Sequence, residues 1–336
     1  MLANKRGSGG HVPASISDNG AILLGSNFTV DSHCDGRPVR VVTHAHSDHT
    51  KGLRSSVRRS LFVIATPITF RFLEVLGYKV PGEKRVELPY YKPINIDSER
   101  IMLVPARHIP GSAQVVVEAP DYRVGYTGDF KVPGTPPLRD LDVLVVDATY
   151  GSPRLQRRWK DWEALEALIA IIEDNVWEGP VWIYGYHGKL QEILLELRKR
   201  GVEYRIMADA RTIALASVAA EYERVDTGRI EVLTDPLLPG PGDIVLAHMR
   251  RRRSYTRLPG THVTLTGWEL RAVAVRTGPK SYNVSYSDHA TFSEILDYIR
   301  EANPGMVIVD GYRSSEAMLT AKYIERLLGV KATYMP

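Results

Sequence analysis

Short apolar runs separated by polar turns fill the first 151 residues of the chain. Residues 28–30 and 39–42 are two such runs, and the turn-type pair Asp35-Gly36 lies between them. This pattern is typical of buried strands. After residue 151 the spacing changes, and residues 159–174 and 190–200 carry apolar side chains at helical intervals. The pattern predicts a strand-rich first part and an alternating helix–strand second part.

The order of these elements predicts one domain interrupted by another. Strands that alternate with helices between residues 152 and 281 indicate a mostly parallel sheet covered on both faces. From about residue 282, a strand–helix–strand–helix pattern can complete the first domain. We therefore expect an α/β protein in which residues 1–151 and 282–336 form one domain and residues 152–281 are inserted. Residues 1–10 are polar and glycine-rich, and we expect them to be mobile.

Composition agrees with this picture without deciding the function. The 336 residues are 44% hydrophobic, which is enough for a large core. No 18-residue apolar run and no charged-then-apolar start is present, so we expect a soluble, cytoplasmic protein with no membrane contact. A single cysteine, Cys34, excludes an internal disulfide. The net charge of +4 suits a partner that carries phosphates, although basic proteins have many other roles.

The first candidate functional residues come directly after the apolar run at residues 39–42. Residues 43–49 read Thr-His-Ala-His-Ser-Asp-His, and four of these seven side chains are potential metal ligands. In an extended segment His44 and His46 point to the same side, while Asp48 and His49 follow in the turn. Imidazole nitrogen and carboxylate oxygen are ligands that zinc accepts. The segment therefore predicts the beginning of two adjacent metal sites.

Two later residues also lie at predicted strand ends. His108 follows the apolar run 101–105, and Asp129 follows the strand predicted to end near residue 126. Either one alone is more often an ordinary loop residue. Downstream of a metal-type cluster we expect both to be ligands. The two oxygens of Asp129 can bridge two cations.

In this order the motifs closely resemble the metallo-β-lactamase superfamily, and within it the β-CASP branch of nucleic-acid-processing enzymes. The resemblance rests on residues 43–49, 106–114, 126–131, 146–151 and 285–289, and it covers nearly the whole chain. The chain is most similar to the group of ligase-associated DNA exonucleases and mRNA 3′-end processing factors. The resemblance implies an αββα sandwich with an inserted β-CASP cap, a parallel sheet flanked by helices. It places the active site in the cleft between the two domains.

The resemblance also implies a ligand set for one or two zinc ions. Three histidines would hold one ion, and an aspartate and a histidine would hold the other. One further carboxylate would bridge the two ions. In that order these residues are His44, His46, His108, Asp48, His49 and Asp129. Asp31 ends the run 28–30 and matches a position that orients a ligand imidazole. A plain turn-forming aspartate is the alternative reading of Asp31.

A proton donor for the leaving oxygen is expected at His289. This residue matches the second cap motif of the family, and Asp147 matches the acidic residue that supports it. An imidazole with a pKa near 6.5 suits an acid at neutral pH. From the residues alone there is another reading, in which Ser287 and Asp288 cap the next helix and His289 only begins it.

One position departs from the family pattern. RNA-processing members carry histidine at the third cap motif and DNA-repair relatives carry valine, whereas this chain has Asp310 there. A carboxylate can still bind a metal ion, and it favours harder ions. We therefore expect Asp310 to belong to the second site, which would then take Mn²⁺ or Mg²⁺ as well as Zn²⁺.

Two segments are candidates for holding a polymer. Lys189 follows a glycine-rich turn at the start of a predicted helix, where free backbone N–H groups can meet a phosphate. Residues 250–253 are four arginines, Arg250, Arg251, Arg252 and Arg253, with Tyr255 close by. Such a patch can follow a phosphate backbone and stack a base. A plain strand–turn–helix and a solvated charged face are the alternatives.

These observations predict a metal-dependent nuclease, a hydrolase of phosphodiester bonds in single-stranded DNA or RNA. We expect an exonuclease of DNA repair or RNA processing. One alternative is a small-molecule metallohydrolase such as a thioesterase, but the large inserted cap that leads to His289 argues against it. The other is a non-catalytic subunit of a processing complex, but such proteins usually lose ligands that this chain retains.

Overall fold

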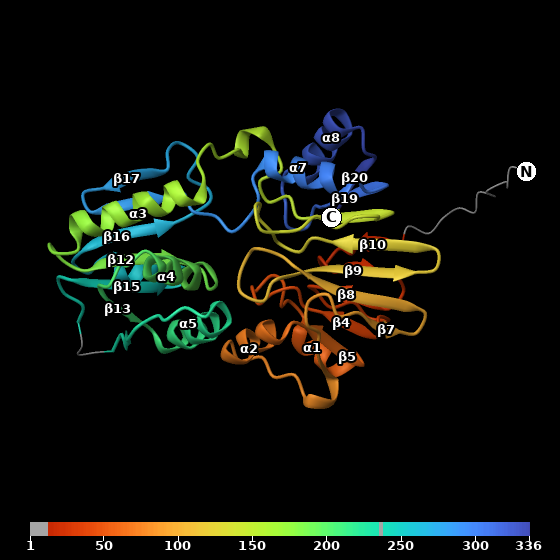
Figure 1. Ribbon diagram of the computed structural model, residues 1–336, viewed down its shortest axis with the longest axis horizontal. Helices are drawn as coiled ribbons and strands as arrows, with labels where there is room; N and C mark the ends of the chain where they lie inside the picture. The colour runs from red at the N-terminus through yellow and green to blue at the C-terminus, as the bar shows by residue number, and fades with distance from the viewer. Residues whose placement is uncertain (1–12, 235–237) are drawn as a thin grey trace, which may run out of the picture.

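The computed structural model describes residues 13–234 and 238–336, so the expected mobility of residues 1–10 lies outside the described residues. Two of its three sheets pack face to face (Figure 1). The first sheet contains, in spatial order, β1 (Ala14–Ile16), β2 (Ile22–Leu24), β3 (Phe28–Val30), β4 (Val39–Val41), β5 (Phe62–Ala65) and β6 (Arg85–Glu87). The second contains β20 (Ala332–Met335), β19 (Met306–Asp310), β11 (Val143–Val146), β10 (Tyr122–Tyr126), β9 (Ala113–Ala119), β8 (Glu99–Pro105) and β7 (Ile94–Ile96).

The two sheets share one apolar core. Ile22 and Val30 of the first sheet belong to the same buried cluster as Val115 and Val145 of the second. Helices α1 (Leu53–Arg59) and α2 (Pro67–Val75) cover the outer face of the first sheet. Helices α7 (Phe292–Ala302) and α8 (Ala317–Leu328) cover the outer face of the second. Figure 1 shows these two pairs on opposite outer sides, which confirms the predicted αββα sandwich.

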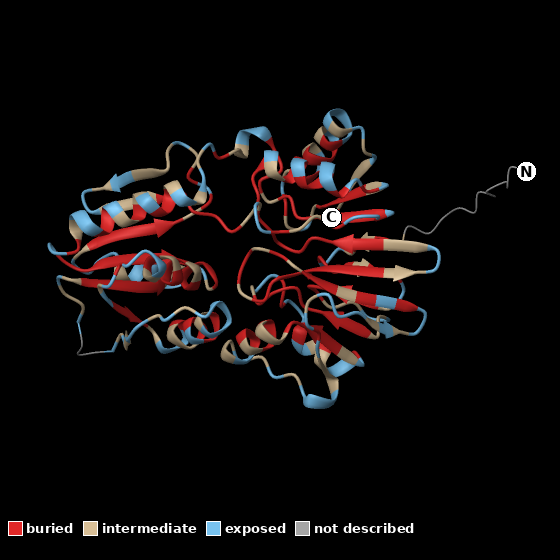
Figure 2. Ribbon diagram, in the orientation of Figure 1, coloured by how far each residue is buried: buried red, intermediate tan, exposed pale blue. Residues whose placement is uncertain are grey.

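The third sheet lies beside the sandwich. Its strands, in spatial order, are β14 (Ile230–Val232), β13 (Arg205–Ala208), β15 (Asp243–His248), β12 (Val181–Gly185), β16 (Thr261–Leu265), β18 (Ser281–Val284) and β17 (Ala274–Gly278). All neighbouring pairs are parallel except β17 and β18. This is the predicted inserted sheet flanked by helices. Figure 2 shows the central strands of all three sheets largely buried.

The two faces of the third sheet are covered unequally. Helices α3 (Asp161–Asn175), α4 (Lys189–Lys199) and α5 (Ala210–Glu223) all pack on one face. On the other face the short helices η3 (Met249–Arg251) and α6 (Arg252–Tyr255) bring the ring of Tyr255 to 5.1 Å from that of Trp182. The cause is topological. The chain runs from β12 through β13 to β14 in one direction along the sheet, and from β15 to β16 in the other. Right-handed crossovers of opposite direction lie on opposite faces.

This reversal fixes where the sheet can bind a ligand. Strands β12 and β15 are neighbours, and the chain leaves them in opposite directions. In parallel sheets a crevice forms at the carboxyl ends of such a pair. The residues that follow β12 and β15 therefore point toward a possible site.

The strands suggest a domain division slightly different from the predicted one. The third sheet uses only strands between residues 181 and 284, and the sandwich uses strands between 14 and 146 and between 306 and 335. The predicted boundary at 281/282 runs through β18, whose four residues pair with β16. We therefore propose that the inserted domain, called the cap below, comprises residues 152–284. Within the described residues, no helix has the length and apolar character needed to cross a membrane.

Candidate metal centre

The metal-type residues meet at one end of the sandwich. Residues 43–49 follow β4, His108 lies in the loop between β8 and β9, and Asp129 follows β10. Strands β8 and β10 both run antiparallel to β9, so their carboxyl ends lie at the same edge of the sheet. Loops that are far apart in the sequence therefore converge there.

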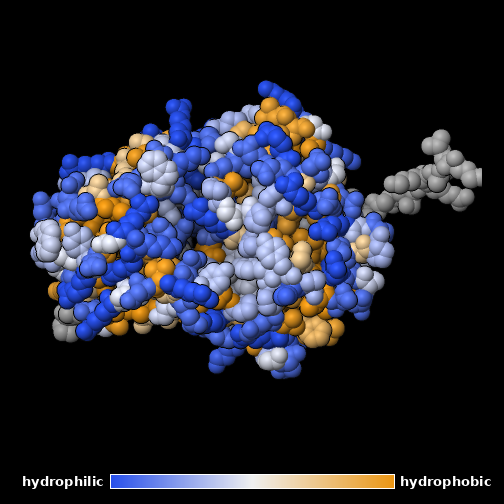
Figure 3. Space-filling view, in the orientation of Figure 1, coloured by the Kyte–Doolittle hydropathy of each residue, from blue (hydrophilic) through white to orange (hydrophobic). Residues whose placement is uncertain are grey.

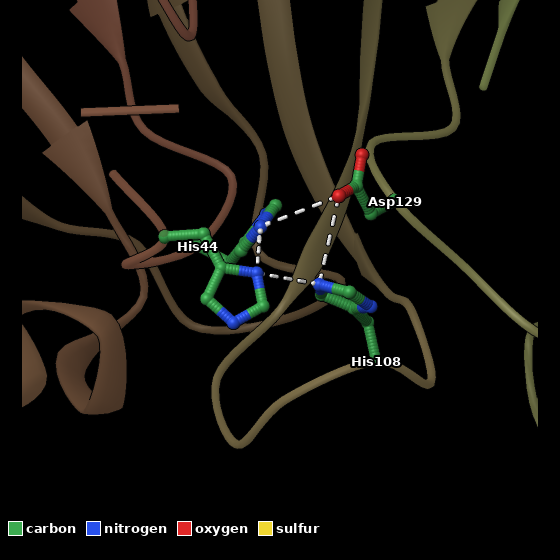
Figure 4. Close-up of side chains that lie close together, drawn as sticks. His44, His108 and Asp129 are labelled. Carbon is green, nitrogen blue, oxygen red and sulfur yellow. Dashed lines mark hydrogen bonds and ion pairs between the residues drawn. The ribbon is translucent and has the colours of Figure 1, made fainter. Parts of the chain in front are cut away.

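Four side chains form a first group around a single point. Nδ1 of His46 lies 3.2 Å from Nε2 of His44 and 3.0 Å from Nε2 of His108. Oδ2 of Asp129 lies 3.6 Å from Nε2 of both His44 and His108. Figure 4 shows His44 and His108 turned toward one place beside Asp129. We call these four residues the three-histidine group.

The separations within this group fit a metal ion. Ligand nitrogens about 2.0–2.1 Å from a tetrahedral zinc ion lie about 3.3 Å from one another. Hydrogen bonds alone explain the convergence less well, because one nitrogen of His46 faces two other imidazole nitrogens. The donor set is mainly nitrogen, which zinc favours, and three of its four residues are buried.

A second group shares Asp129. Nε2 of His49 lies 3.3 Å from Oδ2 of Asp48 and 3.2 Å from Oδ1 of Asp129. Nε2 of His49 and Oδ1 of Asp129 are buried and make no hydrogen bond. A neutral imidazole nitrogen and a carboxylate oxygen in this position can both bind one cation. The two oxygens of Asp129 thus point to different groups, and the Asp48 side chain, 56% exposed, leaves the second group open to the cleft. We call this set the Asp48 group.

Asp31 contacts His49 of the Asp48 group. Its Oδ2 lies 2.7 Å from Nδ1 of His49, and its Oδ1 accepts a hydrogen bond from the backbone N–H of Thr43. The Thr43 hydroxyl also donates to Asp31 and lies 3.0 Å from Nδ1 of His44. A carboxylate that holds the far nitrogen of a ligand fixes which nitrogen faces the metal. These contacts are what the predicted orienting role of Asp31 needs, and the role itself stays a prediction.

Two histidines of the three-histidine group, His46 and His108, make hydrogen bonds to backbone carbonyls in or next to the cap. Nε2 of His46 donates to the backbone carbonyl of His187 at 2.8 Å, and His187 follows cap strand β12. Nδ1 of His108 donates to the backbone carbonyl of Asp288 at 2.9 Å, just after the cap ends. The inserted domain therefore fixes the orientation of the His46 ring, and the segment just after it fixes that of the His108 ring.

The electrostatics of the three-histidine group favour metal binding. Burial, reinforced by the neighbouring His49, holds the pKa of His44 well below its usual range. Burial also lowers the pKa of His108 to about 3. Both rings are therefore neutral at physiological pH, and a neutral imidazole is the form that binds metal ions. Burial disfavours the charged form of Asp129, but His49 and His289 outweigh it and hold the Asp129 pKa well below its usual range.

The predicted proton donor and its partner meet beside the three-histidine group. Nδ1 of His289 lies 2.9 Å from Oδ2 of Asp147, and its Nε2 lies 3.8 Å from Oδ2 of Asp129. Burial opposes the charged ring, but Asp147 and Asp129 raise the pKa of His289 to about 9. Helix α7 begins at Phe292 and is capped by Thr291, so the reading of His289 as a helix-start residue does not hold.

Asp310 lies outside both groups. It is fully buried, and its Oδ2 accepts a hydrogen bond from Arg313 at 2.7 Å. Its Oδ1 accepts from the backbone N–H groups of Tyr312 and Arg313. A buried guanidinium needs an anionic partner, and Arg313 is only three residues away. The structure therefore replaces the expected metal contact of Asp310 with an ion pair, and leaves the Asp48 group with three side chains.

A cleft of about 1300 Å³ lies between the sandwich and the cap, above both groups. Arg250, Arg251 and Arg252 line it, whereas Arg253 does not. Lys189 also lines it, but its ammonium is buried and lies 3.2 Å from the Asp288 carboxylate. Its predicted phosphate contact therefore competes with an ion pair. The face shown in Figure 3 is largely hydrophilic along the junction of the two domains.

Several residues of the cleft were not singled out from the sequence. His187, His248, Trp268 and Arg313 all line it. The glycines on either side of the Tyr186–His187 pair marked a turn, but no sequence signal showed that the His187 carbonyl reaches a ligand. The other three become notable only when strands distant in sequence are brought together.

Three imidazoles and one carboxylate shared by two groups, at the end of an αββα sandwich, are the arrangement of a metal-dependent hydrolase. The matching family model, the beta-lactamase superfamily domain, covers residues 35–173. An uncharacterized protein from the lig 3′ region of Acidianus ambivalens is 41% identical over 138 residues, which are 40% of this chain and 97% of that protein. The chain belongs to the metallo-β-lactamase superfamily, in its β-CASP branch, as the motifs predicted.

Two longer relatives match most of the chain. The 5′ exonuclease Apollo of Gallus gallus is 27% identical over 313 residues, which are 86% of this chain and 63% of Apollo. DNA ligase 6 of Arabidopsis thaliana is 23% identical over 326 residues, which are 86% of this chain and 23% of the ligase. The chain thus spans less than two thirds of either protein.

Proposed function

We propose that this chain is a metal-dependent nuclease that hydrolyses phosphodiester bonds of single-stranded nucleic acid, working from an end. One observation carries the proposal. His46, Asp48 and Asp129, which belong to the three-histidine group and the Asp48 group, line a cleft whose cap side bears Arg250, Arg251 and Arg252. A polyanion can lie along such a wall with one phosphate at the two groups. Similarity to an exonuclease and to a DNA ligase supports a nucleic-acid substrate and favours DNA.

The three-histidine group would hold one zinc ion, and the Asp48 group a second ion, zinc or the harder Mn²⁺ or Mg²⁺. Ions bound there lower the pKa of water and offset the charge of phosphate oxygens. Asp48 lines the cleft and is open to it, so its carboxylate can accept a hydrogen bond from the attacking water and orient it. Asp31 and the carbonyls of His187 and Asp288 hold the imidazoles in place.

The leaving oxygen requires a proton when its bond to phosphorus breaks. His289 is the group placed to deliver it, because Asp147 holds Nδ1 and leaves Nε2 directed toward Asp129 and the cleft. The Asp147 contact fixes the ring orientation and the protonated nitrogen. We propose that the phosphate spans the three-histidine group and the Asp48 group. In this pose the water at Asp48 and the proton donor His289 lie on opposite sides of the phosphate.

DNA and RNA oligonucleotides labelled at the 5′ or the 3′ end test the function directly, each with Zn²⁺, Mn²⁺ or Mg²⁺. We expect shortening from one end, more on DNA than on RNA. His46→Ala and Asp129→Asn should abolish it with the circular dichroism spectrum unchanged. Asp140→Asn, an exposed carboxylate away from the cleft, is the matched control and should keep full activity. Cleavage that survives exhaustive chelation, verified by elemental analysis, would overturn the proposal, as would the absence of cleavage with every metal ion.

A further inference from the structure

An exposed tryptophan lies at the mouth of the cleft and has no role in the chemistry proposed above. Trp268 is 60% exposed and lines the cleft from the turn after cap strand β16. Exposed apolar side chains are common singly, and Trp162 on α3 is equally exposed but does not line this cleft. Position, and not exposure alone, therefore distinguishes Trp268.

The indole is held next to the reaction centre. Its ring centroid lies 5.0 Å from that of Tyr150, which is buried, and the Tyr150 centroid lies 6.2 Å from that of His289. Trp268 is therefore at most about 11 Å from the proposed proton donor. A nucleotide next to a phosphate at His289 can reach it.

Gly267 permits this arrangement. A Cβ atom at residue 267 would lie 2.0 Å from the hydroxyl oxygen of Tyr150 and 2.8 Å from Oγ of Ser287. Only glycine lets the turn approach Tyr150 this closely. The backbone N–H of Trp268 also donates to Oγ1 of Thr266 at 3.2 Å, which fixes the start of the side chain. The indole is thus positioned by its turn before any ligand arrives.

The cationic wall and the indole lie on the same edge of the cap sheet. Strand β12 separates β15, which leads into Arg250, from β16, which leads into Trp268. Strands in a sheet are about 4.8 Å apart, so the two turns begin about 10 Å apart. A strand of nucleic acid can place its phosphates near the arginines while one base reaches the indole.

We propose that Trp268 is a base-stacking residue of the cleft, braced by Tyr150, and that it makes the site select unpaired nucleotides. This inference rests on the proposed nuclease function. Indole stacks with any base, because every base has a π-face. In a duplex the faces of a base are covered by its neighbours, so only an unpaired or frayed base can offer one to Trp268. The contact thus favours single strands without reading their sequence.

Three substitutions and one modified substrate test the stack. Trp268→Ala should lower kcat/KM on a single-stranded oligonucleotide by about 5- to 150-fold, the range that corresponds to about 1–3 kcal/mol for one stacked base. Trp268→Phe should keep most of the activity, and Trp268→Leu should not. Trp162→Ala is the matched control and should behave as wild type. An activated phosphodiester without a base should be hydrolysed equally by wild type and Trp268→Ala.

Oligonucleotides with one abasic nucleotide, moved stepwise from the cleaved end, locate the contact. At one position the missing base should slow wild type by the same factor as Trp268→Ala, with no further loss when both changes are combined. Equal losses from Trp268→Ala on intact and abasic strands at every position would overturn the stack. Full activity of Trp268→Leu would overturn it as well, because an aliphatic side chain cannot stack.

Binding separates this inference from the proposed function. With metal removed by chelation, the fluorescence anisotropy of a labelled oligonucleotide measures affinity without cleavage. We expect Trp268→Ala to weaken binding, and Trp268→Phe to remove most of the tryptophan quenching that the oligonucleotide causes. If wild type cleaves no oligonucleotide but these binding changes are found, the nuclease proposal fails and the stack stands. Unchanged affinity in Trp268→Ala would overturn the stack whether or not the protein cleaves.

Discussion

Nε2 of His46 donates a hydrogen bond of 2.8 Å to the backbone carbonyl of His187, and this bond joins the two domains at the metal centre. His46 belongs to the loop after β4 of the sandwich, and His187 to the turn after β12 of the cap. Because one ring nitrogen is fixed by the cap, the other is directed into the three-histidine group. The cap is therefore part of the metal site as well as the wall of the cleft.

Gly188 keeps that carbonyl in place. It has a φ of +88°, and a Cβ atom there would lie 2.1 Å from Cγ2 of Ile109, so any side chain must push the turn away from the sandwich. We expect Gly188→Ala to weaken zinc binding by about 10- to 100-fold, the range seen when a partner of a metal ligand is lost. Competition with a chromophoric chelator measures this affinity.

Gly201 provides the matched control for Gly188. It has a φ of +75° and lies in the cap, but no atom lies within 4 Å of the position of its Cβ. Gly201→Ala therefore carries a similar backbone strain without a clash. It should lower the melting temperature while leaving zinc affinity unchanged. Equal zinc affinities for the two variants would show that the His187 carbonyl does not position His46.

The role of Asp310 can be separated from that of a metal ligand. The Asp310–Arg313 pair is buried, with side chains 0% and 6% exposed. Asp310→Asn leaves an uncompensated guanidinium, so the free energy of unfolding should fall by about 3–5 kcal/mol. The number of metal ions bound per chain should stay the same. Chemical denaturation and elemental analysis measure the two quantities.

An exposed pair with the same spacing serves as the reference for Asp310. Asp297 and Arg300 are also three residues apart, and their side chains are 60% and 59% exposed. Asp297→Asn should cost less than about 1 kcal/mol, because exposed ion pairs contribute little. A lower metal content in Asp310→Asn, beyond any loss from unfolding, would restore the sequence-based reading of Asp310 as a ligand.

Residues near one another in the sequence were the easiest to predict. His44, His46, Asp48 and His49 lie within six residues, and strand alternation and the turn alone bring them together. The family resemblance was needed to predict that Asp129 joins them, because a single aspartate at the end of a strand is more often an ordinary loop residue. The inserted, mostly parallel sheet was predictable for the same reason, because it follows from local periodicity, whereas the αββα order of the sandwich needed the family resemblance.

Contacts that depend on how the chain packs in three dimensions were not predictable, even between residues close in the sequence. Arg313 stands only three residues from Asp310, yet the sequence did not show that burial would force the two to pair. The proposed end of the cap lies three residues beyond the predicted one, because the sequence of residues 281–284 does not reveal which sheet that strand joins. Arg252 lines the cleft and Arg253 does not, and this difference depends on the orientation of η3 and α6 over the sheet.

Three of the four arginines of residues 250–253 line the cleft, and their effect can be tested against that of arginines outside it. Arg250, Arg251 and Arg252 line the cleft, whereas Arg253 and Arg257 are exposed outside it. Changing the first three to glutamine should weaken oligonucleotide binding for all sequences. The slope of log K against log salt should become shallower by about 0.7 for each lost phosphate contact. Arg253→Gln with Arg257→Gln should change neither quantity. The same effect from both sets would indicate a long-range charge effect in place of contacts in the cleft.

His289 is expected to affect cleavage without affecting binding. His289→Ala should leave oligonucleotide affinity and metal content unchanged while cleavage falls by about 10²–10⁴-fold, the usual contribution of a general acid. Asp147→Asn should act in the same direction but less, because the amide keeps a contact with Nδ1 and loses the charge. The defect of His289→Ala should shrink on a diester with a nitrophenolate leaving group, since that anion departs without a proton. Should both substrates slow by the same factor, or metal content fall, His289 would be a ligand or a structural residue, and the proton would have to come from another group.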